Sequence, residues 1–218
     1  MVRSSKDLGG SPPPAAYRAT GASLAVAVLA VATFVAIMAL HGLRGEIDPV
    51  RQVMSEYANG SHGRVMSVVF YGFGLSSLAL AVRLRHGIGT LRPIFLVPLL
   101  LAAAGLALIA SGLFEVERPL VPDTVEEVLH SYASIAAFVL LVSAMTAVSL
   151  ACRTDPRWWS FRWVSAGLTS VAAVAALLTP LSAGTGWSGA VQRLLGLTVL
   201  LWTLLTAQHV RSRAFHRS

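Results

Sequence analysis

The chain has 218 residues, of which 55% are hydrophobic and only 12% are charged, and its mean hydropathy is +0.68. A soluble globular protein carries about a quarter charged residues, so this composition excludes a water-soluble globular fold. The net charge of +7 would suggest nucleic acid in a soluble protein. In a membrane protein it indicates anionic lipid instead, and we expect no nucleic-acid partner. A single cysteine, Cys152, excludes an internal disulfide and a cysteine-based metal cluster.

The beginning of the chain has the composition of a disordered tail, with two cations followed by Ser11-Pro12-Pro13-Pro14. The apolar run from Ala22 to Leu40 is too long for a signal-peptide core and lacks a clear cleavage site, so we interpret it as a retained first helix. We therefore expect a disordered cytoplasmic tail at 1–19, a transmembrane domain at 20–210 and a basic cytoplasmic tail at 211–218.

Six segments are long and apolar enough to cross a bilayer, for which a helix needs about 20 residues. The predicted spans are 20–42, 64–84, 93–114, 126–151, 161–181 and 188–209. Together they use more than half of the chain, which leaves no room for a separate soluble domain. The predicted fold class is all-α, an integral membrane bundle of six transmembrane helices.

The charges between these segments alternate in kind. Twelve of the 17 cationic residues lie in the two tails and in the links after the second and fourth spans: Arg3, Lys6, Arg18, Arg83, Arg85, Arg92, Arg153, Arg157, Arg162, Arg211, Arg213 and Arg217. Eight of the ten acids lie in the other loops: Glu46, Asp48, Glu56, Glu115, Glu117, Asp123, Glu126 and Glu127. Short loops rich in Lys and Arg stay in the cytoplasm, so we expect both termini inside and the acidic loops outside. The preference for arginine over lysine is typical of a G+C-rich bacterial genome, so we expect a multi-pass protein of the plasma membrane.

The first outer loop predicts a short helix. Asp48-Pro49 suits a helix start, and Asn59-Gly60 suits its end. Apolar side chains recur between them at helical spacing: Val50, Val53, Met54 and Tyr57. We interpret this segment as an amphipathic helix in the membrane interface. Its polar face either covers the bundle or meets water, and the second arrangement is the more frequent.

The start of the fourth span carries the next candidate residues. Thr124 and Glu127 fit a capping box, which accounts for Glu127. Glu126 and His130 lie four residues apart on one helix face. Glu127 and His130 also spell the Glu-x-x-His motif of metal-binding helix bundles. Such sites need further carboxylates from other helices, so we expect neither a metal nor another cofactor.

In the sixth span, Arg193 lies about one and a half turns inside the membrane, which is costly unless it is paired or faces a wet cavity. Alternatively, its long side chain extends to the interface. By helix counting, Arg193 and His130 lie at similar depth. We predict a polar cluster near the outer face, with a catalytic role, formed by Glu56, Glu126, His130 and Arg193. His41 and His62, near the ends of spans, are interpreted as interfacial histidines.

The same segments resemble a known family. Asp48 to Tyr57, Gly112-Leu113-Phe114, His130, Gly189 to Arg193, and Trp202 are similar to the bacterial and archaeal membrane family catalogued as domain of unknown function 998. The resemblance covers essentially residues 20–210. It implies a six-helix membrane protein with these polar residues on one side, and it implies no activity.

Three functions remain open at this point. The first is a lipid- or isoprenoid-directed enzyme or binding protein, in which a carboxylate, an imidazole and an arginine serve acid–base chemistry or hold a head group. The second is a small-molecule transporter, which needs a polar path through the bundle. The third is a non-catalytic subunit or assembly factor, recognised by a membrane protein partner through the outer loops.

Overall fold

The computed structural model describes residues 14–87, 96–114 and 124–215. These parts of the chain are helical, with turns and loops between the helices. The long helices are α1 (Pro14–Leu43), α2 (Gly63–Gly87), α3 (Leu96–Leu113), α4 (Val125–Thr154), α5 (Arg162–Leu181) and α6 (Ser188–Phe215). Two short 3₁₀ helices, η1 (Met54–Ala58) and η2 (Pro156–Trp158), lie in the connections.

All six long helices are long and apolar enough to span a membrane, which confirms the predicted all-α bundle. The helices extend further than predicted at both ends of the chain. Helix α1 begins inside the expected tail at 1–19, and α6 continues past residue 210. Residues 1–13 and 216–218, which make up the rest of the two predicted tails, lie outside the described residues.

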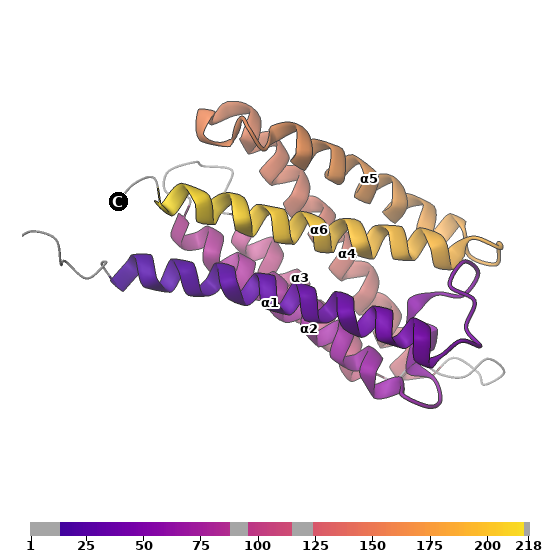
Figure 1. Ribbon diagram of the computed structural model, residues 1–218. Helices are drawn as coiled ribbons and strands as arrows, with labels where there is room; N and C mark the ends of the chain where they lie inside the picture. Colours follow the sequence, from indigo (N-terminus) through magenta and orange to yellow (C-terminus); the bar gives the residue numbers. More distant parts are fainter. Residues whose placement is uncertain (1–13, 88–95, 115–123, 216–218) are drawn as a thin grey trace, which may run out of the picture.

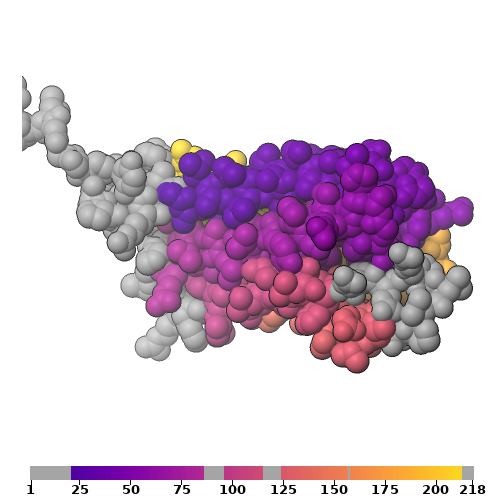
Figure 2. Space-filling model, turned by 90° about the horizontal axis from the view of Figure 1, so that it is seen from below, coloured from indigo at the N-terminus to yellow at the C-terminus, as the bar shows by residue number. Residues whose placement is uncertain are grey.

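The helices run up and down the long axis of the bundle, so that alternate connections lie at opposite ends (Figure 1). We call one end the acidic end; it carries residues 44–62, the turn at 182–187 and the start of α4. Figure 2 shows residues 44–62 and the first turns of α4 at this same end of the molecule. The opposite, basic end carries Arg85, Arg153, Arg162 and Arg211 among the described cations.

The helix predicted in the first loop is shorter than expected. The Asp48 carboxylate accepts hydrogen bonds from the N–H groups of Val50 (2.9 Å) and Arg51 (3.4 Å), which forms a turn rather than a helix. Val53 is extended, with ψ at 154°, and separates that turn from η1. Met54 and Tyr57 are buried as the periodicity predicts, because η1 packs onto the end of the bundle.

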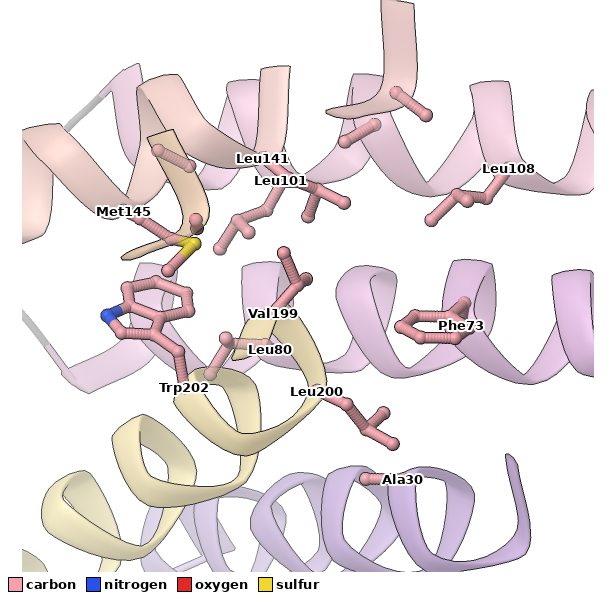
Figure 3. Packing of buried hydrophobic residues seen from close by; sticks show 14 of the residues in the cluster. Ala30, Phe73, Leu80, Leu101, Leu108, Leu141, Met145, Val199, Leu200 and Trp202 are labelled. Atoms are coloured by element: carbon pink, nitrogen blue, oxygen red, sulfur yellow. The ribbon is translucent and has the colours of Figure 1, made fainter. Parts of the chain in front are cut away.

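Large side chains fill the middle of the bundle and its basic half. Trp202 of α6 lies close to Met145 and Leu80, with Leu101 and Leu141 beyond them (Figure 3). The indole N–H of Trp202 donates to Ser165 Oγ (3.0 Å), and Ser149 Oγ lies 2.7 Å from Ser165 Oγ. Inside a bilayer helices associate through such packing and hydrogen bonds, because lipid tails are as apolar as leucine.

Arg83, counted in a loop from the sequence, is part of α2 and only 3% exposed. Its Nε donates to Ser23 Oγ of α1 (2.9 Å), and Nη2 donates to the carbonyl oxygen of Val210 of α6 (2.9 Å). The guanidinium therefore joins three helices near the basic end. A buried cation needs such acceptors, since an unpaired one in hydrocarbon is costly.

Helices α2 and α3 approach so closely that their backbones touch at two glycines. A Cβ on Gly105 would lie 2.7 Å from the carbonyl oxygen of Gly74, and a Cβ on Gly74 would lie 2.6 Å from that of Gly105. Only a residue without a side chain fits at either position. Small residues at helix contacts serve this purpose in membranes.

We expect Gly105→Ala to lower the stability of the protein, because α2 and α3 must move apart to admit the methyl group. Overpacking of this kind costs about 1–3 kcal/mol. The matched control is Gly167→Ala on α5, where an added Cβ meets nothing within 4 Å. Thermal unfolding in detergent, followed by size-exclusion chromatography, should show a lower midpoint than the wild type for Gly105→Ala and an unchanged midpoint for the control. Equal midpoints would contradict the close contact.

Candidate functional site

Arg193 lies at the acidic end, with its side chain only 9% exposed. Its Nη1 donates to the carbonyl oxygen of Gln52 (2.6 Å), and its Nε donates to Nε2 of His41 (3.0 Å). The guanidinium carbon also lies 5.4 Å from the ring centroid of Tyr57, a cation–π distance. No carboxylate among the described residues forms an ion pair with Arg193. The arginine therefore faces neutral acceptors and does not extend to the surface.

The contact with Arg193 requires one tautomer of His41. Nδ1 of His41 lies 2.7 Å from the carbonyl oxygen of Ile37. A carbonyl oxygen only accepts, so Nδ1 carries the hydrogen and Nε2 is free to accept from Arg193. The His41 ring also packs against Tyr57, with 5.3 Å between the ring centroids. His41, interpreted from the sequence as an interfacial histidine, is thus a central member of this cluster.

Glu56 belongs to the same end of the molecule but bonds within its own loop. Its carboxylate accepts from the side-chain amide of Gln52 (2.7 Å) and from the N–H of Val53 (3.2 Å). The carbonyl oxygen of that same Gln52 accepts from Arg193. Glu56 and Arg193 are therefore linked through Gln52 and do not touch each other as an ion pair.

The loop is further attached to the start of α6 by hydrogen bonds from main-chain N–H groups. The N–H of Ala190 donates to the carbonyl oxygen of Val50 (2.9 Å), and the N–H of Met54 donates to Gln192 Oε1 (2.5 Å). A Cβ on Gly189 would lie 2.2 Å from the carbonyl oxygen of Gln52, so this approach requires glycine. Residues 44–62 thereby form a roof over the acidic end, and we call them the roof loop.

A second arginine fastens the other side of the roof loop. Nη1 of the buried Arg44 donates to the carbonyl oxygens of Tyr57 (3.1 Å) and Ser61 (2.9 Å). Its Nε donates to the exposed carboxylate of Glu46, and this hydrogen bond lowers the pKa of Glu46. Two guanidinium groups thus supply hydrogen bonds that the irregular backbone of the loop cannot make with itself.

Beneath the roof loop lies a pocket of about 200 Å³. Five polar side chains line it: Ser55, His130, Ser131, Ser134 and Gln192. The other lining residues are apolar or aromatic, except for glycine, and come from η1, α2, α3, α4 and α6: Met54, Met66, Val69, Phe70, Phe73, Leu108, Ile135, Phe138 and Gly196. Among the described residues, no acid, lysine or arginine lines the pocket.

His130 is 5% exposed and is fixed by α3 and α2. Its Nδ1 lies 2.8 Å from the carbonyl oxygen of Ser111, and its ring forms a T-shaped pair with that of Phe70 at a centroid distance of 5.2 Å. In the neutral imidazole, Nδ1 therefore donates and Nε2 accepts. Nε2 lies 3.5 Å from Ser134 Oγ, one turn further along α4.

The start of α4 places Glu126 away from this pocket. Thr124 caps the helix, because its Oγ1 accepts from the N–H of Glu127 (3.3 Å). Glu126 is exposed and forms no hydrogen bond or ion pair with another described residue. Within the described ranges, no group of three or more His, Cys, Asp and Glu side chains is arranged to hold a metal ion.

The four predicted site residues thus occupy three places at one end of the bundle. Glu56 and Arg193 hold the roof loop, His130 lines the pocket below it, and Glu126 lies on the exposed face of α4. The neighbours Gln192 and Arg193 connect the first two places, since one lines the pocket while the other binds the loop. Their catalytic role stays a prediction.

Sequence reasoning missed His41, Gln52 and Tyr57 as partners of Arg193. The one indication of such partners was the depth of Arg193 in the membrane. A cation at that depth needs nearby acceptors, but the sequence does not identify them. Ser134 was also missed; it lies four residues after His130, on the same helix face, and that spacing was the signal.

We expect Arg193→Ala to loosen the roof loop while the six helices remain folded. Hydrogen bonds to a charged group are each worth about 1.5–3 kcal/mol, so amide hydrogen exchange at 50–59 should rise by roughly tenfold or more. The matched control is Arg51→Ala, because the Arg51 side chain is 75% exposed and its nearest acid, Asp48, lies 3.6 Å away. Unchanged exchange in Arg193→Ala, measured by mass spectrometry, would contradict the anchoring role.

Comparison with known proteins agrees with the resemblance seen in the sequence. The family model described as protein of unknown function, DUF998, matches residues 24–209. That range holds the second to fifth helices that could span a membrane, all but three residues of the first and of the sixth, and every residue of the roof loop and the pocket. No curated protein and no solved structure matches the chain. The chain therefore belongs to the DUF998 family of proteins of unknown function.

Proposed function

We propose that this protein binds an amphiphilic molecule of the bilayer, a lipid or an isoprenoid-like compound, in the pocket beneath the roof loop. The observation that carries the proposal is the order of the lining residues. Ser55, His130 and Gln192 lie toward the acidic end beside Met54 and Met66, while the lining residues furthest from that end, Phe73 and Phe138, are apolar. This order matches a molecule with a polar group at one end and a hydrocarbon chain behind it.

The side of the pocket is accessible from the surroundings of the bundle. Ser131 and Ile135 of α4 line it and are exposed, Ile135 by 60%. In Figure 1, α4 and α5 lie close together near the basic end and diverge toward the acidic end. A pocket of about 200 Å³ is smaller than the usual ligand site. It suits one end of a chain molecule whose remainder lies between the diverging helices.

The packing of the rest of the bundle supports binding over transport. Below the pocket, Leu141, Met145 and Trp202 are 1% exposed or less and fill the space between the helices. The hydroxyl groups of Ser149, Ser165 and Thr169 bond to one another rather than facing a path. A site closed on the basic side favours a molecule that enters and leaves sideways.

The polar residues at this site have different roles in the proposal. His130 faces the bound molecule and offers an acceptor, which suits hydrogen bonding and proton transfer. Arg193 and Glu56 act indirectly, because they hold the roof loop from which Met54 and Ser55 reach the pocket. The exposed Glu126 has no part in this version of the site.

We further propose that the acidic end faces the outside of the plasma membrane, as the charge distribution predicts. Single cysteines test this orientation, because the native Cys152 is fully buried. A membrane-impermeant maleimide on intact cells should label Glu46→Cys and leave Ser212→Cys unlabelled until the cells are opened. The two positions are exposed at opposite ends of the bundle. The reverse pattern would place the pocket in the inner leaflet.

We expect Gly196→Leu to abolish binding by filling the pocket. A Cβ at Gly196 meets Phe73 and Met54 at ordinary contact distances of 3.8 and 3.9 Å, so a larger side chain extends into the cavity. The measurement is photolabelling in nanodiscs with diazirine-bearing long-chain alcohols, one straight and one isoprenoid, followed by peptide mapping. Labelled peptides from α2 and α4 are expected in the wild type.

The matched control for this experiment is Gly167→Leu, which adds the same side chain at an open position of α5. It should be labelled like the wild type. If Gly196→Leu is labelled as strongly as the control, the pocket is not the binding site. A partner protein that co-purifies with wild type and Gly196→Leu alike would favour a non-catalytic subunit instead.

A further inference from the structure

The directions of the hydrogen bonds around His130 leave two acceptors side by side in the pocket wall. Ser111 Oγ donates to the carbonyl oxygen of Ala107 (3.0 Å) and so has no further hydrogen to give. It accepts instead from Ser134 Oγ (3.1 Å), which uses the single hydrogen of Ser134. The Oγ atom of Ser134 therefore offers only lone pairs to the pocket.

The same reasoning applies to the imidazole. Nδ1 of His130 donates to the carbonyl oxygen of Ser111 (2.8 Å), so Nε2 presents a lone pair. Nε2 and Ser134 Oγ lie 3.5 Å apart, and both residues line the pocket. With Ser134 donating to Ser111, neither atom supplies a hydrogen to the other. The pair is therefore complementary to a hydrogen-bond donor that approaches from the pocket.

The lack of cationic residues among the described lining side chains further restricts the chemical class of the ligand. Within the described part of the chain, no cationic side chain lines the pocket, and the nearby Arg193 is directed to His41 and to the roof loop. An anionic phosphate placed here would be buried without a counter-ion, which is strongly unfavourable. A lone-pair acceptor such as Nε2 would also repel it.

We propose, on the basis of the function proposed above, that the ligand carries an uncharged hydroxyl group as its polar end, and that this hydroxyl shares its one hydrogen between His130 Nε2 and Ser134 Oγ in a three-centre hydrogen bond. The chemical class is a long-chain alcohol, either a hydroxyl-bearing lipid or an isoprenoid alcohol. Gln192, which donates and accepts through its amide, lies on the facing helix and completes the polar end of the site. His130 and Ser134 then determine specificity for the head group.

The test compares head groups on identical chains. Diazirine-bearing straight-chain and isoprenoid probes are each prepared as the free alcohol and as its phosphate monoester, and are presented in nanodiscs. In the wild type the alcohols should label the peptide that carries His130 at least about tenfold more strongly than the esters, a difference of the size of one hydrogen bond. The stronger of the two alcohols identifies the source of the chain.

Two variants locate the recognition. His130→Phe keeps a ring and removes the acceptor, and Ser134→Ala removes the second acceptor; each should reduce labelling by the alcohols and leave labelling by the esters unchanged. Ser143→Ala is the matched control on α4, because Ser143 is exposed and bonds to its own helix at Val139 (2.8 Å). Thermal midpoints of all variants show whether the fold is kept.

The outcomes separate this inference from the proposed function. Labelling of the pocket by the phosphate esters at least as strong as by the alcohols would overturn the hydroxyl preference and leave amphiphile binding intact. If both variants are folded and the alcohols label them as strongly as the wild type, the hydroxyl preference is likewise overturned. If no probe of either kind labels the pocket of the wild type, the proposed function itself fails.

Discussion

At the acidic end of the bundle, the guanidinium group of Arg193 connects α6 with α1 and with the roof loop, and no carboxylate of the described residues pairs with it. A cation at this depth must have acceptors, because hydrocarbon supplies none. A backbone carbonyl and the neutral ring of His41 provide them, and Tyr57 covers the group with its ring face. The irregular backbone of the loop needs donors in turn, and Nη1 of Arg193 supplies one to the carbonyl oxygen of Gln52.

This attachment determines where the pocket is and what covers it. Gln192 and Arg193 are neighbours in the chain and extend from the same turn of α6. Arg193 holds the loop, while Gln192 receives the N–H of Met54 and lines the cavity beneath. The roof and the pocket are therefore parts of one arrangement, so a change in the loop also affects the site. Through that coupling Arg193, which lies outside the pocket, can act on the binding proposed above.

The two halves of the bundle are stabilised in different ways. In the basic half, interhelical hydrogen bonds join α4, α5 and α6, and Arg83 joins α1, α2 and α6. In the acidic half, α4 and α5 diverge, and polar contacts with the roof loop take over (Figure 1). In hydrocarbon there is no hydrophobic driving force for closing a gap between helices, so an opening toward lipid costs little free energy. The pocket lies in the half where such an opening is present.

The fold class and most helix boundaries can be predicted from the amino-acid sequence, because the length of an apolar segment and its hydrocarbon solvent dictate a spanning helix. The sequence also identified one end of the bundle as the polar end, and Glu56, His130 and Arg193 as members of it. Which of these residues contact one another depends on the packing of the helices. Exposure of Glu126, the tautomers of His41 and His130, and the pairing of Arg193 with Gln52 depend on how helices distant in sequence approach one another. A helical pattern records which face is apolar, but not the rotation and spacing of neighbours, and hydrogen bonds form or fail within an ångström of that spacing.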